Sequence, residues 1–173
     1  MSAPSIREAI ERVSAAISAD PTKARAKNAP ATARLTQGLS CEVTGPYDAR
    51  VVTDMPPAMG GTASGPNPGW LLRGALASCT ATLVAMRAAK LGVALTTLEV
   101  TVESESDNRG MLGLDENVAA GLAAVRTTVK IGGNADPQAL RDLVAWADAH
   151  SPVGCTIRDA PPCALEIEVA QGG

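Results

Sequence analysis

The sequence predicts an α+β fold arranged around one long helix in the middle of the chain. A run of apolar and small residues extends from Asn67 to Leu91, and segments of alternating apolar residues precede and follow it. Pairs of strands that alternate with helices favour an α+β fold over a doubly wound parallel sheet. The length of 173 residues suits one core of ordinary size.

The predicted central helix begins at Pro68, because proline fits the first turn of a helix. Its length approaches that of a membrane span, which needs about 20 apolar residues with few charges. It carries Arg73, Arg87 and Lys90 and many small residues, so we expect a buried core helix and no membrane segment. The positions at helical spacing from Cys79 are all apolar: Leu72, Ala75, Leu76, Leu83 and Met86.

Two different regions precede this helix. Apolar residues at helical spacing predict a helix over residues 5–17 with Ser5 as its cap, and a linker follows, so we assign residues 1–30 to an N-terminal helix and linker. The main domain, residues 31–173, opens with one strand from Thr32 to Val43. A turn and a second strand complete a hairpin, and a loop rich in proline and glycine leads into the central helix.

The second half of the chain repeats the signals for strands and helix starts. Gly92 is a plausible helix stop, and Asp136 and Ser151 each precede a proline as helix caps. The predicted elements are strands over 95–106 and 122–133 with a polar excursion between them, a helix from 137 to about 150, a short helix that carries Cys155, and a last strand over 163–170.

The central helix is apolar nearly all round, and one small sheet can cover only one of its sides. A second copy of the chain would cover the other side. We therefore expect an obligate homodimer with the central helices packed together.

Composition excludes several partner classes. The chain has 15 Lys and Arg against 18 Asp and Glu, without a basic block, and aromatic residues make up 2%. We therefore expect no nucleic-acid partner. The N-terminus lacks the pattern of a signal peptide, which favours the cytoplasm. The four cysteines form no C-x-x-C pair and His150 is the single histidine, so we predict no metal site and no cofactor.

The four cysteines divide into two pairs. Cys41 and Cys163 lie in predicted strands, where a free cysteine usually behaves as a small hydrophobic residue. Cys155 lies in the first turns of a short helix, where the helix dipole favours a thiolate. Cys79 lies within the central helix and, from its apolar neighbours alone, is explained better by core packing than by reactivity.

Two segments together resemble a known family. The stretch NPGWLLRGALASCTAT, followed much later by SPVGCTIRD, resembles the OsmC/Ohr family of organic hydroperoxide reductases and osmotically induced proteins. In that family a motif like N-P-E-x-L-x-x-A-x-x-A-C opens the central helix, and C-P-[VY]-S lies near the C-terminus. The resemblance extends over most of the chain from about Thr32. It implies an OsmC-like intertwined homodimer, in which antiparallel or mixed sheets cover two long central helices.

The resemblance also implies a chemistry and its residues. Cys79 falls on the cysteine that attacks the peroxide, and a second thiol then condenses with the sulfenic acid that forms. Arg50 is the candidate for the family's arginine beside the reactive thiol, and Cys155 for the second thiol. Asn67, Gly69, Leu72 and Ser151 are predicted to line the substrate site. A dithiol reductant such as a lipoylated protein would restore the enzyme.

Two departures from the family pattern keep a second function open. Gly69 stands where the family has a carboxylate, and Ser151 stands where it has the second cysteine, one helical turn before Cys155. Ser151 also has a full explanation as a helix cap. The resemblance implies a thiol-dependent peroxidase that reduces organic hydroperoxides. The alternative is a diverged protein without turnover that binds a small apolar ligand at the dimer interface.

Overall fold

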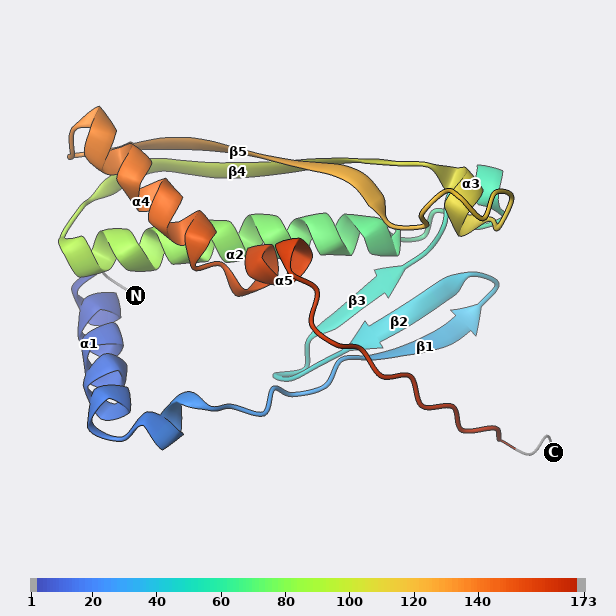
Figure 1. The fold of residues 1–173 in the computed structure, drawn as a ribbon, viewed down its shortest axis with the longest axis horizontal. Coiled ribbons are helices and arrows are strands. Elements are labelled where there is room, and N and C mark those ends of the chain that lie inside the picture. Colours follow the sequence, from blue (N-terminus) through green and yellow to red (C-terminus); the bar gives the residue numbers. More distant parts are fainter. Residues whose placement is uncertain (1–2, 171–173) are drawn as a thin grey trace.

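The computed structural model describes residues 3–170 and has two separate sheets on either side of one long helix (Figure 1). Its helices and strands are α1 (Ala3–Ala19), β1 (Thr32–Gln37), β2 (Ser40–Thr44), β3 (Arg50–Thr53), α2 (Pro68–Leu91), β4 (Leu95–Ser106), α3 (Asn108–Met111), β5 (Leu122–Gly133), α4 (Pro137–Ala149) and α5 (Pro152–Arg158). Short 3-10 helices occupy Pro21–Ala24 and Pro57–Met59. The mixed α+β class predicted from the sequence is confirmed.

Helix α2 is bounded by the local signals in the sequence. The Asn67 side chain accepts a hydrogen bond from the backbone N–H of Trp70 at 2.9 Å, and Pro68 occupies the first turn. Gly92 ends the helix with a left-handed φ of 74°, a conformation that glycine adopts without a steric penalty. The 24-residue helix therefore starts and stops where predicted.

The two faces of α2 have different surroundings. One face is buried against β4, α4 and α5 and carries Leu76, Thr80, Val84 and Ala88. The opposite face is open, and this open face of α2 consists of Leu72, Ala75, Ser78, Cys79, Thr82 and Met86. By length and composition α2 would also suffice to cross a membrane, a test that core helices of soluble proteins pass as well. A single chain thus covers one side of this helix only.

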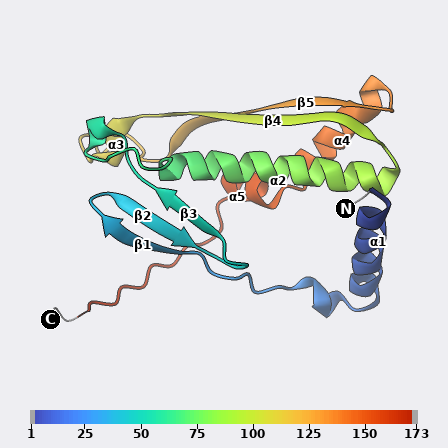
Figure 2. The same ribbon diagram turned by 180° about the vertical axis from the view of Figure 1, so that it is seen from behind.

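The first half of the main domain forms a three-stranded antiparallel sheet, β1–β2–β3, where the sequence predicted a two-stranded hairpin. The predicted strand from Thr32 to Val43 is wrong as a single element. Gly38 has a φ of 57°, and the chain reverses there so that Leu35 pairs with Cys41. The second sheet is a long β4–β5 ribbon that lies along α2 (Figure 2).

The predicted last strand over residues 163–170 is also wrong for the single chain. The segment is extended and exposed, with Leu165, Ile167 and Val169 at 85%, 77% and 87% exposure. A strand requires a neighbour for its backbone hydrogen bonds, and the segment pairs with no strand of the described chain. Its alternating pattern indicates a β-strand, but within this chain the pattern has no sheet to join.

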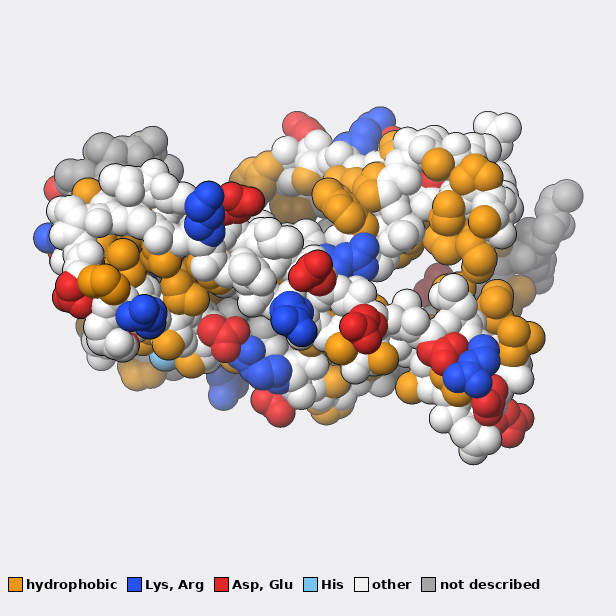
Figure 3. Space-filling model, turned by 90° about the horizontal axis from the view of Figure 1, so that it is seen from above, with side chains coloured by type: hydrophobic (Ala, Val, Ile, Leu, Met, Phe, Trp, Pro, Cys, Tyr) orange, Lys and Arg blue, Asp and Glu red, His pale blue; other side chains and the backbone are white. Residues whose placement is uncertain are grey.

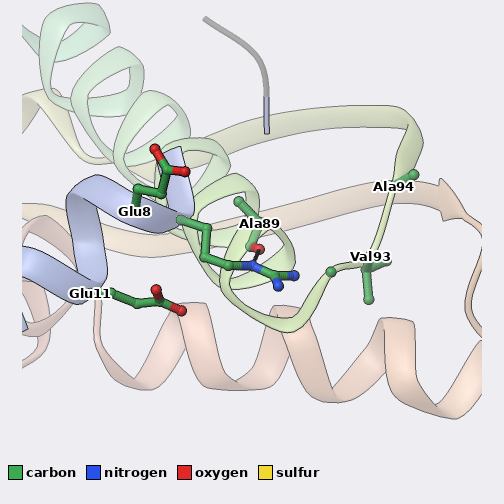
Figure 4. A pocket seen from close by; sticks show the side chains of 7 residues that line it. Glu8, Glu11, Ala89, Val93 and Ala94 are labelled. Carbon is green, nitrogen blue, oxygen red and sulfur yellow. Dashed lines mark hydrogen bonds between the residues drawn. The ribbon is translucent and has the colours of Figure 1, made fainter. Parts of the chain in front are cut away.

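Helix α1 packs across the C-terminal end of α2. The Arg7 Nε donates a hydrogen bond to the Ala89 carbonyl oxygen at 2.9 Å, which satisfies an end carbonyl of α2. Figure 4 shows Glu8 and Glu11 on α1 facing this end, beside a groove of about 560 Å³. The helix begins at Ala3, so Ser5 lies inside its first turn, and the prediction that Ser5 caps the helix is wrong. Residues 1–2 of the predicted N-terminal segment (1–30) and residues 171–173 of the predicted main domain (31–173) lie outside the residues that the structure describes.

Candidate functional site

The candidate site lies at Cys79, midway along the open face of α2. The thiol is partly buried, and its Sγ accepts a hydrogen bond from the Ser151 Oγ at 3.3 Å. A groove of about 430 Å³ borders the sulfur. Its lining is mainly apolar and includes Ala75, Ser78, Thr82, Leu83, Pro152 and Val153. The arrangement places a nucleophilic atom at the edge of a groove that can hold an apolar group.

Ser151 connects the start of α5 to Cys79. Its hydroxyl accepts a hydrogen bond from the Gly154 N–H at 3.0 Å, so the predicted N-cap is confirmed. Because the cap fixes this hydroxyl, its own proton is available to the Cys79 sulfur. The Ser151 side chain is fully buried at 0% exposure, whereas the Cys79 thiol that it contacts is partly buried. A thiolate at Cys79 would therefore accept a charge-assisted hydrogen bond.

Cys155 lies one turn further along α5 and has other contacts. Its Sγ donates to the Ala149 carbonyl oxygen at 3.6 Å and accepts from the Arg158 Nη2 at 3.5 Å. The hydrogen bond to Cys155 and the ion pair with Asp148 at 3.1 Å raise the pKa of Arg158. Pro152 and Val153 border the Cys79 groove, whereas Cys155 is not among its lining residues.

The other two cysteines lie apart from this groove. Cys41 is partly buried in β2, as expected of a small hydrophobic residue in a sheet. Cys163 is exposed and belongs to the extended C-terminal segment, so its predicted place in a strand is wrong for the single chain. Its Sγ donates to the Pro161 carbonyl oxygen at 3.5 Å.

Arg50 is engaged on the three-stranded sheet. Its Nη1 lies 2.8 Å from the Glu42 Oε1 on the neighbouring strand, and the side chain is 68% exposed. The contact that the structure gives this guanidinium is thus with Glu42 and not with Cys79. Acidic and basic side chains are interspersed across the face of the molecule in Figure 3.

The predicted substrate residues fall into two places. Leu72 lies on the open face of α2 with Cys79, at 41% exposure. Asn67 and Gly69 lie at the start of α2, in a second pocket of about 430 Å³ that α3 and the preceding loop also line. Arg73, which the sequence did not suggest as a site residue, fills the space beside Gly69 and donates to the Ser104 Oγ at 3.1 Å.

The loop that leads into α2 is organised by a buried carboxylate at Asp54. Its side chain is 2% exposed and accepts hydrogen bonds from Met55 N–H and from the N–H and hydroxyl groups of Thr62 and Ser64. These hydrogen bonds, led by that from the Thr62 hydroxyl, hold the pKa of Asp54 well below its usual value. A side chain at Gly61 or Gly65 would collide with the backbone carbonyls of Met55 or Val52, which explains two of the loop glycines.

Comparison with known proteins identifies the family. Residues 61–166 match the model of a family described as OsmC-like protein. The chain belongs to the OsmC-like family. The matched region includes the second part of the loop before α2, the whole of α2 with Cys79, and Ser151. No curated protein gave a significant match.

Solved structures share the OsmC-like fold at low sequence identity. An OsmC-like protein from Mycoplasma pneumoniae superposes with a TM-score of 0.67 at 16% identity, covering 79% of this chain and 91% of that one. An organic hydroperoxide resistance protein OsmC from Legionella pneumophila superposes with a TM-score of 0.61 at 20% identity, and the match covers 78% of this chain and 92% of that one. An organic hydroperoxide resistance protein from Elizabethkingia anophelis superposes with a TM-score of 0.61 at 20% identity, and the match covers 79% of this chain and 91% of that one. The predicted family and fold are confirmed.

The described residues offer no preformed metal site. Within residues 3–170, no group of three or more His, Cys, Asp and Glu side chains is placed to hold a metal ion. The Cys79 sulfur and the Ser151 hydroxyl meet beside the groove.

Proposed function

We propose that this protein is a thiol-dependent peroxidase that reduces organic hydroperoxides through Cys79. The observation that carries the proposal is the Cys79 sulfur at the edge of an apolar groove, with a buried hydroxyl donating to it at 3.3 Å. Membership of the OsmC-like family supports it, as do neighbours described as organic hydroperoxide resistance proteins. A cytoplasmic location and reduction by a dithiol are parts of the same proposal.

The reaction follows from the groups at the site. The Cys79 thiolate attacks one peroxide oxygen, the O–O bond breaks, and the alkoxide leaves and takes up a proton as the alcohol. The sulfur is oxidised by two electrons and carries the transferred oxygen as a sulfenic acid. The Ser151 hydroxyl stabilises negative charge on the sulfur before attack. The apolar groove receives the carbon part of the hydroperoxide.

Removal of the nucleophile tests this function. Cys79→Ser is expected to lower the rate of cumene hydroperoxide consumption, measured with excess dithiothreitol, by at least roughly 100-fold. The matched control is Cys163→Ser, which removes an exposed thiol of the C-terminal segment and should retain the wild-type rate. Equal rates for wild type and Cys79→Ser would contradict the proposal.

A second candidate function is supported by Gly69 and Ser151, which replace two groups of the family pattern. In this alternative the protein binds a small apolar ligand beside Cys79 without turnover. Wild type and Cys79→Ser would then consume peroxide at the same slow rate, while both bind an apolar fluorescent probe in the groove. That combination would favour the alternative over the peroxidase.

We also propose that the active form is a homodimer. The open face of α2 and the three-stranded sheet both carry exposed apolar side chains. The exposed fraction is 36% for Met86, 69% for Leu35 and 41% for Val52. The C-terminal segment adds an extended, alternating apolar edge. A second copy of the chain would bury these surfaces together, since each is apolar and lacks cover within the described chain.

A charge on the open face of α2 tests the dimer. Met86→Glu is expected to sediment as a monomer, or to fail to fold, because a buried carboxylate without a partner is strongly unfavourable. Lys130→Glu, a charge change on the exposed side of β5, should leave the wild-type mass unchanged. A stable folded monomer of the wild type in sedimentation equilibrium would overturn the dimer.

A further inference from the structure

We infer that Cys79 follows a single-thiol cycle, in which the reductant and not this chain supplies the second sulfur. The inference rests on the proposed peroxidase function and concerns how the oxidised site is restored. It departs from a cycle in which a second cysteine of the chain forms a disulfide with Cys79. Three features of the structure carry it.

The first feature is the residue that touches the Cys79 sulfur. Ser151 fills the position beside it, with its Oγ 3.3 Å from the Sγ and no solvent exposure. A hydroxyl cannot condense with a sulfenic acid to form a disulfide. Because Ser151 also caps α5, its side chain is held in place and occupies the space that another thiol would need on that side.

The second feature is the placement of the other three thiols. Cys155 is held between the Ala149 carbonyl and Arg158, whose guanidinium is tied to Asp148. Moving its sulfur to Cys79 would break these two contacts of Cys155. Cys41 is fixed in β2, opposite Leu35 and Thr53, and Cys163 lies on the C-terminal segment.

The third feature is access from outside. The groove of about 430 Å³ beside Cys79 is open to solvent in the single chain, and Pro152 and Val153 line it together with residues of α2. Because the hydroperoxide must reach the Cys79 sulfur through this groove in the active form, a thiol of similar size can reach the sulfur as well. The mainly apolar lining favours a thiol on an apolar carbon chain over a charged one.

The cycle balances with an external thiol as reductant. The sulfenic acid on Cys79 condenses with one thiol to give a mixed disulfide and water. A second thiolate then attacks the reductant sulfur of that disulfide and releases the Cys79 thiolate. Two thiols become one disulfide and supply the two electrons, whether they come from two monothiol molecules or from one dithiol.

The test uses intact mass and a sulfenic acid trap on the full chain. After one equivalent of cumene hydroperoxide, dimedone should label one site in wild type and in Cys155→Ser, and none in Cys79→Ser. Without dimedone, added 2-mercaptoethanol should give a mixed disulfide on Cys79, seen as a mass increase that dithiothreitol reverses. Cys155→Ser is informative because it removes the nearest thiol along the chain from Ser151.

The outcomes separate the two proposals. A disulfide that links Cys79 to another cysteine, within one chain or between two, with loss of the dimedone adduct, would overturn the single-thiol cycle and leave the peroxidase intact. Four unmodified thiols after peroxide treatment would overturn the peroxidase itself. A trapped sulfenic acid in both wild type and Cys155→Ser, followed by the mixed disulfide, supports the inference.

Discussion

Ser151→Cys is expected to convert the site into one that forms a disulfide with Cys79 after oxidation by peroxide. The Ser151 Oγ lies 3.3 Å from the Cys79 Sγ, whereas a disulfide needs about 2.05 Å. The longer C–S bond of cysteine brings the new sulfur closer, so a shift of about 1 Å by α5 closes the gap. The sulfenic acid on Cys79 would then condense with this thiol and release water.

The measurement is the loss of the dimedone adduct and of two free thiols after one equivalent of cumene hydroperoxide. Ser78→Cys is the matched control, since it adds a thiol to the same groove at a position whose hydroxyl hydrogen-bonds Ala75. It should retain the sulfenic acid on Cys79. Persistence of that adduct in Ser151→Cys would show that the contact between Ser151 and Cys79 is not kept in solution.

The same position has a stability effect that must be measured separately. Replacing an N-cap serine with alanine costs about 0.5–2 kcal/mol, so Ser151→Ala should lower the thermal midpoint. Ser151→Cys is expected to lose a similar amount in the reduced protein, because a thiol is a weak acceptor for the Gly154 N–H. Comparing the two variants separates the loss of the cap from the new sulfur chemistry.

Asp54→Asn is expected to cause the largest loss of stability among the polar substitutions considered. The Asp54 carboxylate accepts hydrogen bonds from three backbone N–H groups and two hydroxyls. In asparagine, an NH₂ group replaces one of the two accepting oxygens, so its N–H donors would face the N–H donors of the loop. We expect the thermal midpoint to fall by roughly 5 °C or more, with the loop before α2 loosened. Asp48→Asn, in an exposed turn with a left-handed φ of 57° that asparagine tolerates, should change it little.

The pH dependence of this effect has a defined sign. The pKa of Asp54 is lowered in the folded state, so the unfolded chain takes up the proton first as the pH falls. The stabilisation by the carboxylate is therefore complete above its unfolded pKa of about 3.9 and declines below it. The midpoint difference between wild type and Asp54→Asn should be full at about pH 7 and about pH 5, and smaller at about pH 3. An unchanged difference across this range would contradict the assignment to Asp54.

The sequence by itself determined the starts of α2, α4 and α5, the end of α2, and the fold class. Asn67, Asp136 and Ser151 each cap a helix that opens with proline, and Gly92 ends α2, as their types predict. These signals are legible because a cap bonds to backbone groups two or three residues away, so no distant part of the chain is needed to form it. The family resemblance at Cys79 and the long alternating strands also depend on local sequence.

Only the tertiary structure decided which side chains meet. Cys79 and Ser151 are 72 residues apart, and their contact depends on how α4 and α5 pack against α2. Packing of β2 against β3 also placed Arg50 on Glu42. The segment 163–170 has the pattern of a strand but no partner strand in the described chain. A strand pattern specifies which side chains alternate, whereas the neighbour that supplies its hydrogen bonds is fixed by tertiary or quaternary contacts.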